Sequence, residues 1–233
     1  PKPADAEGVG LFHLNAVDVS DDGIIFVCNM SLGSDETHPF RVYRWDDETA
    51  DPQTVISYEG GVGRLGDMFS VYGHADDNSL VIYAAVSGGT QIVKFTTDDF
   101  GSTFTPTIIN LPPGAMGSVP NVADFGDGTI YVKSYGKPLI HYKMDGTLID
   151  TVSTEVVGTS ASKISALDMG DEKIILAYYP NVGGGSGSEY AVGVDVTYGA
   201  KNAFLRGYTS SLGDATNGNG TGSVDFMQVD QEE

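Results

Sequence analysis

The stretch that decides the fold is NAVDVSDDGIIFVCN, Asn15–Asn29, in which two apolar runs flank the acidic turn Ser20–Gly23. Two further runs follow it, FRVYRW at Phe40–Trp45 and a last one at Thr54–Tyr58. Short runs of β-branched and aromatic residues between Asp- and Gly-rich turns are typical of β-strands. This part of the chain therefore predicts a unit of four short antiparallel strands.

The same unit returns three times and then starts again. Its first, more polar strand is expected at Asn15–Val19, Asp67–Gly73, Ser118–Phe125, Lys163–Met169 and Ser223–Asp230. The other strands are expected at Leu80–Ala85, Gln91–Phe95 and Thr107–Leu111; at Thr129–Ser134, Leu139–Met144 and Thr147–Val152; and at Lys173–Tyr179, Tyr190–Val196 and Ala203–Tyr208. Repeats of about 40–50 residues with four strands each are typical of propeller blades.

We therefore predict an all-β chain, a single β-propeller-like domain over residues 1–233. Its blades are four-stranded and antiparallel, and the chain holds about four and a fraction of them. The units run at about 8–60, 64–115, 118–158 and 160–213, with a partial unit at 218–233. The turn Asp145-Gly146 is a strong hairpin signal within the third unit.

The charge is strongly acidic, with 12 Lys and Arg against 32 Asp and Glu and a formal net charge of −20. Such a surface repels nucleic acids and anionic membranes, so neither is expected as a partner. No apolar run approaches the roughly 18–20 residues that a membrane-spanning helix needs. The single cysteine, Cys28, excludes an internal disulfide and is expected to be a buried apolar residue. Because the chain opens with Pro1, we interpret it as processed or trimmed.

Loops of a propeller blade open on two faces. We call the first face the one that carries the loops between second and third strands and between one blade and the next. The second face carries the other hairpin loops and is expected to collect Asp21, Asp22, Asp46, Asp47, Glu48, Asp51, Asp76, Asp77, Asp98, Asp99, Asp127, Asp145, Asp171 and Glu172. The first face holds only Asp35, Glu36, Glu59 and Asp214, together with the long Gly-rich loops.

Loops on a rigid scaffold are where binding groups concentrate, which makes the first face the better candidate for a site. Its polar and aromatic residues are Asn29, His38, Arg64, Asp67, Asn121, Tyr135, Lys163, Tyr179 and Asn181. Arg, Asp and Asn beside aromatic rings suit sugar hydroxyls, which both donate and accept hydrogen bonds. For Arg64 and Asp67 the sequence also favours a plain structural pair that pins their loop.

Several sequence patterns resemble ligand-binding motifs but lack residues or elements that those motifs require. The run Asp18–Gly23 has the D-x-[DN]-x-[DN]-G pattern only superficially, and it favours a tight turn over a calcium loop. Weak calcium binding by the acidic loops remains compatible with their charge, and no other cofactor is expected. The four histidines lack metal-ligand spacing, so no metal site is expected. Gly61–Gly66 spells G-x-G-x-x-G without a following helix, which argues against a dinucleotide site.

The motifs NAVDVSDDGIIFVCN, FRVYRW and GRLGDMFSVYG (Gly63–Gly73) resemble an uncharacterised family of secreted, propeller-like proteins from gut bacteria. The resemblance extends over roughly residues 14–229. It implies an extracytoplasmic setting (periplasmic, cell-surface or secreted, as in a surface lipoprotein), where glycan capture is a common task. No catalytic residue carries over from it.

Three functions follow as hypotheses. The first is a non-catalytic module that binds a glycan or a protein partner around Arg64, Asp67 and Tyr179. The second is a glycoside hydrolase or polysaccharide lyase with a carboxylate pair at the mouth of a propeller channel. The third is a structural component whose blades dock to another chain. The sequence leans toward the first, and in that case Arg64→Ala weakens binding with little change in melting temperature.

Overall fold

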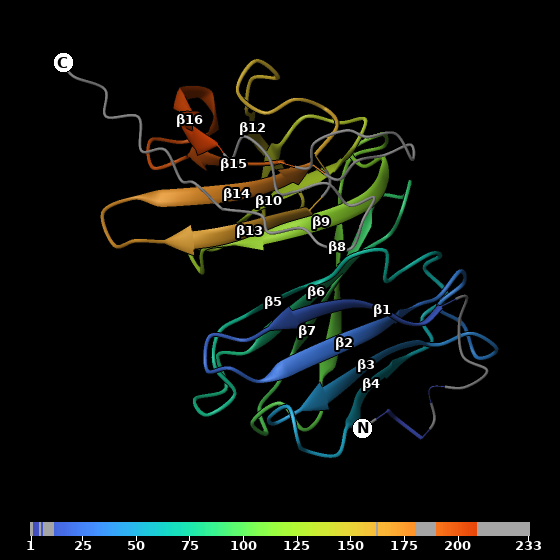
Figure 1. The fold of residues 1–233 in the computed structure, drawn as a ribbon. Helices are drawn as coiled ribbons and strands as arrows, with labels where there is room; N and C mark the ends of the chain where they lie inside the picture. Colours follow the sequence, from blue (N-terminus) through green and yellow to red (C-terminus); the bar gives the residue numbers. More distant parts are fainter. Residues whose placement is uncertain (1, 5, 7–11, 162, 180–189, 209–233) are drawn as a thin grey trace, which may run out of the picture. The chain divides into compact units, whose positions relative to one another are not determined.

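The protein is built from four antiparallel four-stranded sheets, the blades of a β-propeller fold (Figure 1). The computed structural model describes residues 2–4, 6, 12–161, 163–179 and 190–208. Within these residues the only helical element is one 3-10 turn, Ala200–Asn202, and no helix is long and apolar enough to cross a membrane. The predicted fold class is confirmed. The predicted fifth strand, Ser223–Asp230, lies outside the described residues.

The chain divides into two compact units, an N-terminal unit, Pro1–Val122, and a C-terminal unit, Ala123–Glu233. The N-terminal unit holds two complete blades (Figure 1). The first is β1 (Phe12–Val19), β2 (Ile25–Met30), β3 (Phe40–Trp45) and β4 (Gln53–Tyr58); the second is β5 (Ser70–Tyr72), β6 (Val81–Ala85), β7 (Gln91–Thr96) and β8 (Thr105–Asn110).

The third and fourth blades make up the C-terminal unit, apart from the first residues of β9, which belong to the N-terminal unit. The third blade is β9 (Ser118–Asp124), β10 (Thr129–Tyr135), β11 (Ile140–Lys143) and β12 (Leu148–Thr151). The fourth is β13 (Lys163–Asp168), β14 (Lys173–Tyr179), β15 (Tyr190–Asp195) and β16 (Phe204–Tyr208). Every strand expected in the first four units is therefore present.

The second inner strand is shorter than expected. A strand was predicted over Asp67–Gly73, but β5 covers only Ser70–Tyr72. The residues just before it are used by the loop instead, since Leu65 forms a backbone bridge with Ser31 and Asp67 pairs with Arg64.

Polar side chains of the inner strands link the two blades of the N-terminal unit. The Asn15 amide donates to the carbonyl of Gly66 (N···O 2.7 Å), and the N–H of Val71 donates to Asp18 Oδ2 at 3.0 Å. Strands that bond in this way satisfy their edge groups without apolar packing. The polar residues Asn15 and Asp18 of the first run therefore have a structural role in this unit.

The core of the N-terminal unit lies between its two blades. The alternating residues Phe26 and Cys28 of β2 are fully buried there, facing Ile82 and Ala84 of β6. Phe95 stacks on Phe40 and meets the edge of Tyr58, with ring centroids 6.1 and 5.5 Å apart. The prediction that Cys28 is a buried apolar residue is confirmed, and burial raises the pKa of its thiol.

The C-terminal unit has a core of its own between the third and fourth blades. It contains Tyr131 of β10 together with Ile175 and Ala177 of β14. These residues repeat the alternation seen in β2 and β6, because side chains two apart on a strand point to the same face.

Candidate functional site

The sorting of loops into two faces holds within the N-terminal unit. On the first face the β2–β3 loop meets the β4–β5 loop, where Gly61 N–H donates to the carbonyl of Ser34 at 2.7 Å. On the second face the β1–β2 and β5–β6 turns meet, where Asp21 N–H donates to the carbonyl of Gly73 at 3.0 Å. Each face is thus a surface of loops joined by backbone hydrogen bonds.

The loop before β5 is pressed against β2 at a glycine. Gly66 has φ +87°, and a Cβ built there would lie 1.9 Å from the carbonyl oxygen of Asn29. Only glycine fits both the left-handed backbone and the close approach. Its neighbours Arg64 and Asp67 are thereby fixed at the edge of the first blade.

Arg64 and Asp67 form the pair that the sequence favoured. The guanidinium donates from Nε to Asp67 Oδ2 at 2.8 Å and from Nη2 to Oδ1, so the contact is bidentate. The Asp67 side chain is 5% exposed, whereas that of Arg64 is 41% exposed. A buried carboxylate therefore holds a guanidinium that still faces solvent. Toward the described part of the chain, the guanidinium uses two of its five N–H groups, which leaves three for other acceptors.

Further hydrogen bonds stiffen the first face around this pair. The carbonyl of Arg64 accepts from Ser87 N–H at 3.0 Å, and Ser87 Oγ accepts from Val119 N–H at 3.3 Å. Gly88 N–H donates to the carbonyl of Gly117 at 2.8 Å. The β6–β7 and β8–β9 loops are thus tied to the loop that carries Arg64.

Asn29 and Asn121 are buried and bonded within the N-terminal unit. The Asn29 amide donates to the carbonyl of Pro39 at 3.0 Å and accepts from Arg41 N–H at 2.8 Å, which closes the β2–β3 loop. The Asn121 amide donates to Ser70 Oγ at 2.9 Å. Both were predicted to bind a ligand, and the structure shows them holding backbone and strand instead of facing solvent. His38 is exposed in the β2–β3 loop, with Nδ1 3.7 Å from Asp35 Oδ1.

The remaining predicted residues belong to the C-terminal unit. Tyr135 is exposed at the end of β10, and Lys163 is half-buried at the start of β13. Tyr179 ends β14, and Asn181 lies outside the described residues. The structure brings together Asn29, Arg64 and Asp67 around Gly66, and the others stay separate predictions.

The acids of the second face have a structural role. Asp47 Oδ1 accepts from the N–H and the hydroxyl of Thr49, at 2.7 and 2.6 Å. Asp127 does the same with Thr129, at 3.0 and 2.7 Å. Side chains that bond their own backbone two residues on are turn-forming. These carboxylates therefore close hairpins, beyond any contribution to solubility.

The same hydrogen bonds keep the carboxylates ionised. The Thr103 hydroxyl and N–H, with the Thr97 hydroxyl, lower the pKa of Asp99 to about 2. Among the described residues, every carboxyl whose pKa departs clearly from its ordinary value has it lowered: Asp22, Asp47, Asp77, Asp99, Asp127 and Asp145. Such groups serve as hydrogen-bond acceptors or ligands rather than as proton donors.

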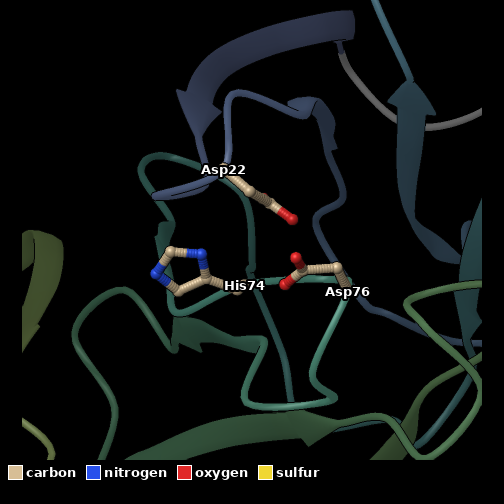
Figure 2. Close-up of side chains that lie close together, drawn as sticks. All are labelled: Asp22, His74 and Asp76. Carbon is tan, nitrogen blue, oxygen red and sulfur yellow. The ribbon is translucent and has the colours of Figure 1, made fainter.

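One group of side chains on the second face has a metal-like donor set. Asp22 comes from the β1–β2 turn, and His74 and Asp76 come from the β5–β6 turn; their ligand atoms all lie within 4.8 Å of one another. Figure 2 shows the two carboxylates pointing toward each other with the imidazole beside them. All three residues are exposed, and Asp22 already accepts from Ser20 Oγ at 2.5 Å and from Ala75 N–H at 2.7 Å.

Lys133 is a residue that the sequence analysis missed. It is fully buried on β10, and its amine donates to four backbone carbonyls. Burial lowers the pKa of Lys133 to about 8. A lysine directly after the apolar run Ile130–Val132 is the signal that could have marked it.

Comparison with known families matches residues 3–206 to a family described as a domain of unknown function, DUF4623. The chain belongs to the DUF4623 family. This confirms the resemblance to an uncharacterised family. A DUF4623 protein of known structure from Bacteroides eggerthii agrees with the gut-bacterial context; its TM-score is 0.63 at 18% identity. The match covers 82% of this chain and 44% of that one, so this DUF4623 chain spans less than half of its relative's length.

Other solved structures share the fold at lower identity. The GH43 protein BlXynB from Bacillus licheniformis has a TM-score of 0.54 at 11% identity, over 82% of this chain and 41% of that one. A GH43 endo-arabinanase from the same species has a TM-score of 0.52 at 10% identity, over 97% of this chain and 82% of that one. Among curated proteins no sequence matches the DUF4623 chain.

Proposed function

We propose that this DUF4623 chain is a non-catalytic binding module that captures a glycan on the first face of its N-terminal unit, in an extracytoplasmic setting. The observation that carries the proposal is the Arg64–Asp67 pair. A buried carboxylate fixes a half-exposed guanidinium, whose three remaining N–H groups are available to acceptors.

The physical advantage of this arrangement is preorganisation. A free arginine loses rotamer entropy when it binds a ligand, and Arg64 has already been ordered by Asp67. The bidentate contact also leaves the pair neutral overall, which suits hydroxyl-rich ligands. A chain with a net charge of −20 repels polyanions but not neutral sugars.

The carboxyl groups favour binding over hydrolysis. A glycosidase needs one carboxylic acid with a raised pKa to protonate the leaving group. The shifted carboxyls among the described residues have lowered pKa values, and Asp67 is held by Arg64. A hydrolase remains the alternative function, because two structural neighbours carry GH43 names. Their likeness shows the fold alone, but it is a reason to include arabinan among the test ligands.

The test is a thermal-shift and calorimetric screen against neutral polysaccharides and oligosaccharides, arabinan included, with and without calcium. Each mixture is then analysed for new reducing ends and for unsaturated sugar products. Binding without new products supports the module, and new reducing ends identify a hydrolase. If no sugar gives a thermal shift, a binding heat or a new product, glycan capture is refuted and a protein partner is indicated.

A matched pair of variants places the site. Arg64→Lys keeps a positive charge beside Asp67 but removes the planar fork and its spare donors. Arg44→Lys makes the same change on the second face, where Arg44 Nε donates to Asp46 Oδ1 at 2.8 Å. For a glycan found in the screen, we expect Arg64→Lys to weaken binding roughly tenfold or more, the effect of about 1.4 kcal/mol. Arg44→Lys should leave the affinity unchanged, and equal effects of the two variants would refute the placement.

A further inference from the structure

Lys133 is buried with an unusual set of partners. Its Nζ lies 2.6 Å from the carbonyl oxygen of Ala161, 2.7 Å from that of Lys137, 2.9 Å from that of Ser134 and 3.3 Å from that of Thr159. All four acceptors are backbone carbonyls. An ammonium has three N–H donors for these four carbonyls, so the contact to the Thr159 carbonyl, the longest, is the weakest hydrogen bond.

The first blade has a small residue, Cys28 of β2, at the place that corresponds to Lys133. Cys28 Sγ reaches toward the carbonyl of Gly66, just before the next inner strand, at 3.8 Å. Lys133 makes the corresponding contact to the carbonyl of Ala161, just before β13, with its amine at 2.6 Å.

The four carbonyls come from two loops of the first face in the C-terminal unit. Ser134 is near the end of β10 and Lys137 is in the turn after it, and Thr159 and Ala161 belong to the loop between β12 and β13. Carbonyl oxygens that converge on one point repel each other unless a cation lies between them, as in ion-binding sites built from backbone. Between these two loops the charged end of Lys133 occupies that point.

We propose that Lys133 acts as a tethered cation that positions these two first-face loops, and that truncating it leaves a binding site for a small primary ammonium ion. The role is independent of the glycan proposed for the N-terminal unit. Lys133 thereby sets the backbone on both sides of Tyr135, the exposed aromatic residue of this face.

The test is chemical rescue of Lys133→Ala. Alanine keeps Cβ, and n-propylammonium supplies the missing three carbons and the amine. We expect the variant to lose at least about 5 °C in melting temperature, because four backbone carbonyls, two of them in buried contacts, lose the ammonium donor. Added n-propylammonium should restore at least half of that loss, whereas 1-propanol and tetramethylammonium at equal ionic strength should not. The exposed Lys143→Ala is the matched control and should melt like the wild type.

Two results would overturn the proposal. One is a melting temperature of Lys133→Ala equal to that of Lys143→Ala. The other is equal rescue by 1-propanol, which would show that only the volume of the side chain matters. If the alanine variant does not fold, Lys133→Met keeps the apolar stem and removes only the amine.

In Lys133→Met, hydrogen exchange at Gly136 N–H, which donates to the Thr159 carbonyl at 2.9 Å, should rise at least about tenfold while exchange in β14 stays unchanged. Unchanged exchange at Gly136 would refute the positioning role.

Discussion

Replacing Arg64 by alanine tests whether the pair on the first face is structural as well as available to a ligand. The change leaves the Asp67 carboxylate, whose side chain is 5% exposed, without its ion partner. Removing one partner of a fully buried pair costs about 3–5 kcal/mol. Arg64 is itself 41% exposed, so water screens part of the pair and the cost is lower.

The expected loss of unfolding free energy is about 1.5–3 kcal/mol, the range for hydrogen bonds to charged groups. The sequence alone favoured almost no change in melting temperature for this variant. The buried carboxylate reverses that expectation. Arg44→Ala is the comparison, since its partner Asp46 is 55% exposed and stays hydrated, so the ion pair itself should contribute less than about 1 kcal/mol. Arg44 is 16% exposed and also donates to the Phe100 carbonyl, so the rest of its loss reflects that bond and its packing.

The assay is urea unfolding followed by the fluorescence of Trp45. This is the only tryptophan of the chain, it is 8% exposed, and it lies on β3 of the N-terminal unit. Its signal therefore reports the unit that contains the pair. Circular dichroism, recorded in parallel, follows the strands of both units.

A double-mutant cycle with Asp67→Asn separates the pair from the rest of the loop. We expect the double variant to be more stable than the sum of the single changes predicts, by about 1–2 kcal/mol. A coupling near zero would refute the pair as a source of stability. So would an Arg64→Ala midpoint within about 0.5 kcal/mol of the wild type at unchanged slope.

Three further predictions concern single positions. Gly66→Ala should unfold the N-terminal unit or lower its stability by several kcal/mol, because its Cβ would lie 1.9 Å from the Asn29 oxygen at φ +87°; near-native urea unfolding would contradict this. Asp99 has a pKa of about 2 in the folded state, below the ordinary value of about 3.9. Its contribution to the free energy of unfolding is therefore present above pH 4 and lost as the pH falls toward 2. Asp99→Asn should flatten the acid limb of the stability curve, and an unchanged limb would argue against its hydrogen bonds to Thr103. If the acidic turns bind calcium weakly, Asp76→Asn should reduce a calcium-induced thermal shift, and a shift equal to that of the wild type would exclude this cluster.

The strands were predictable because each one carries its own signal. The alternation of Phe26 and Cys28 with half-exposed neighbours marks β2 without any tertiary information. Turns were equally clear, since Asp145-Gly146 favours a hairpin, and the hairpin is present between β11 and β12. The Arg64–Asp67 pair could be inferred for the same reason, as both residues lie within one short loop.

Contacts between distant segments could not be predicted in this way. Asp22 and His74 are far apart in the chain, and they meet only because the first turns of two blades lie side by side. The role of Asn29 depends on Pro39 and Arg41, whose backbone reaches it only after the β2–β3 loop has formed. The role of Lys133 depends in the same way on distant residues, since its carbonyl partners at Thr159 and Ala161 belong to a different loop.

The charge asymmetry between the faces has a physical origin that bears on function. Hairpins of the second face are closed by carboxylates, such as Asp47 and Asp127, that accept from the residue two positions on. Loops of the first face are closed by backbone bridges, by Asn29 and by the amine of Lys133, with Asp35 accepting from the N–H groups of Thr37 and His38. Turn-forming acids are therefore concentrated on the second face, and the first face carries less negative charge. A ligand that approaches the first face meets the spare donors of Arg64 with less repulsion from the chain's own charge.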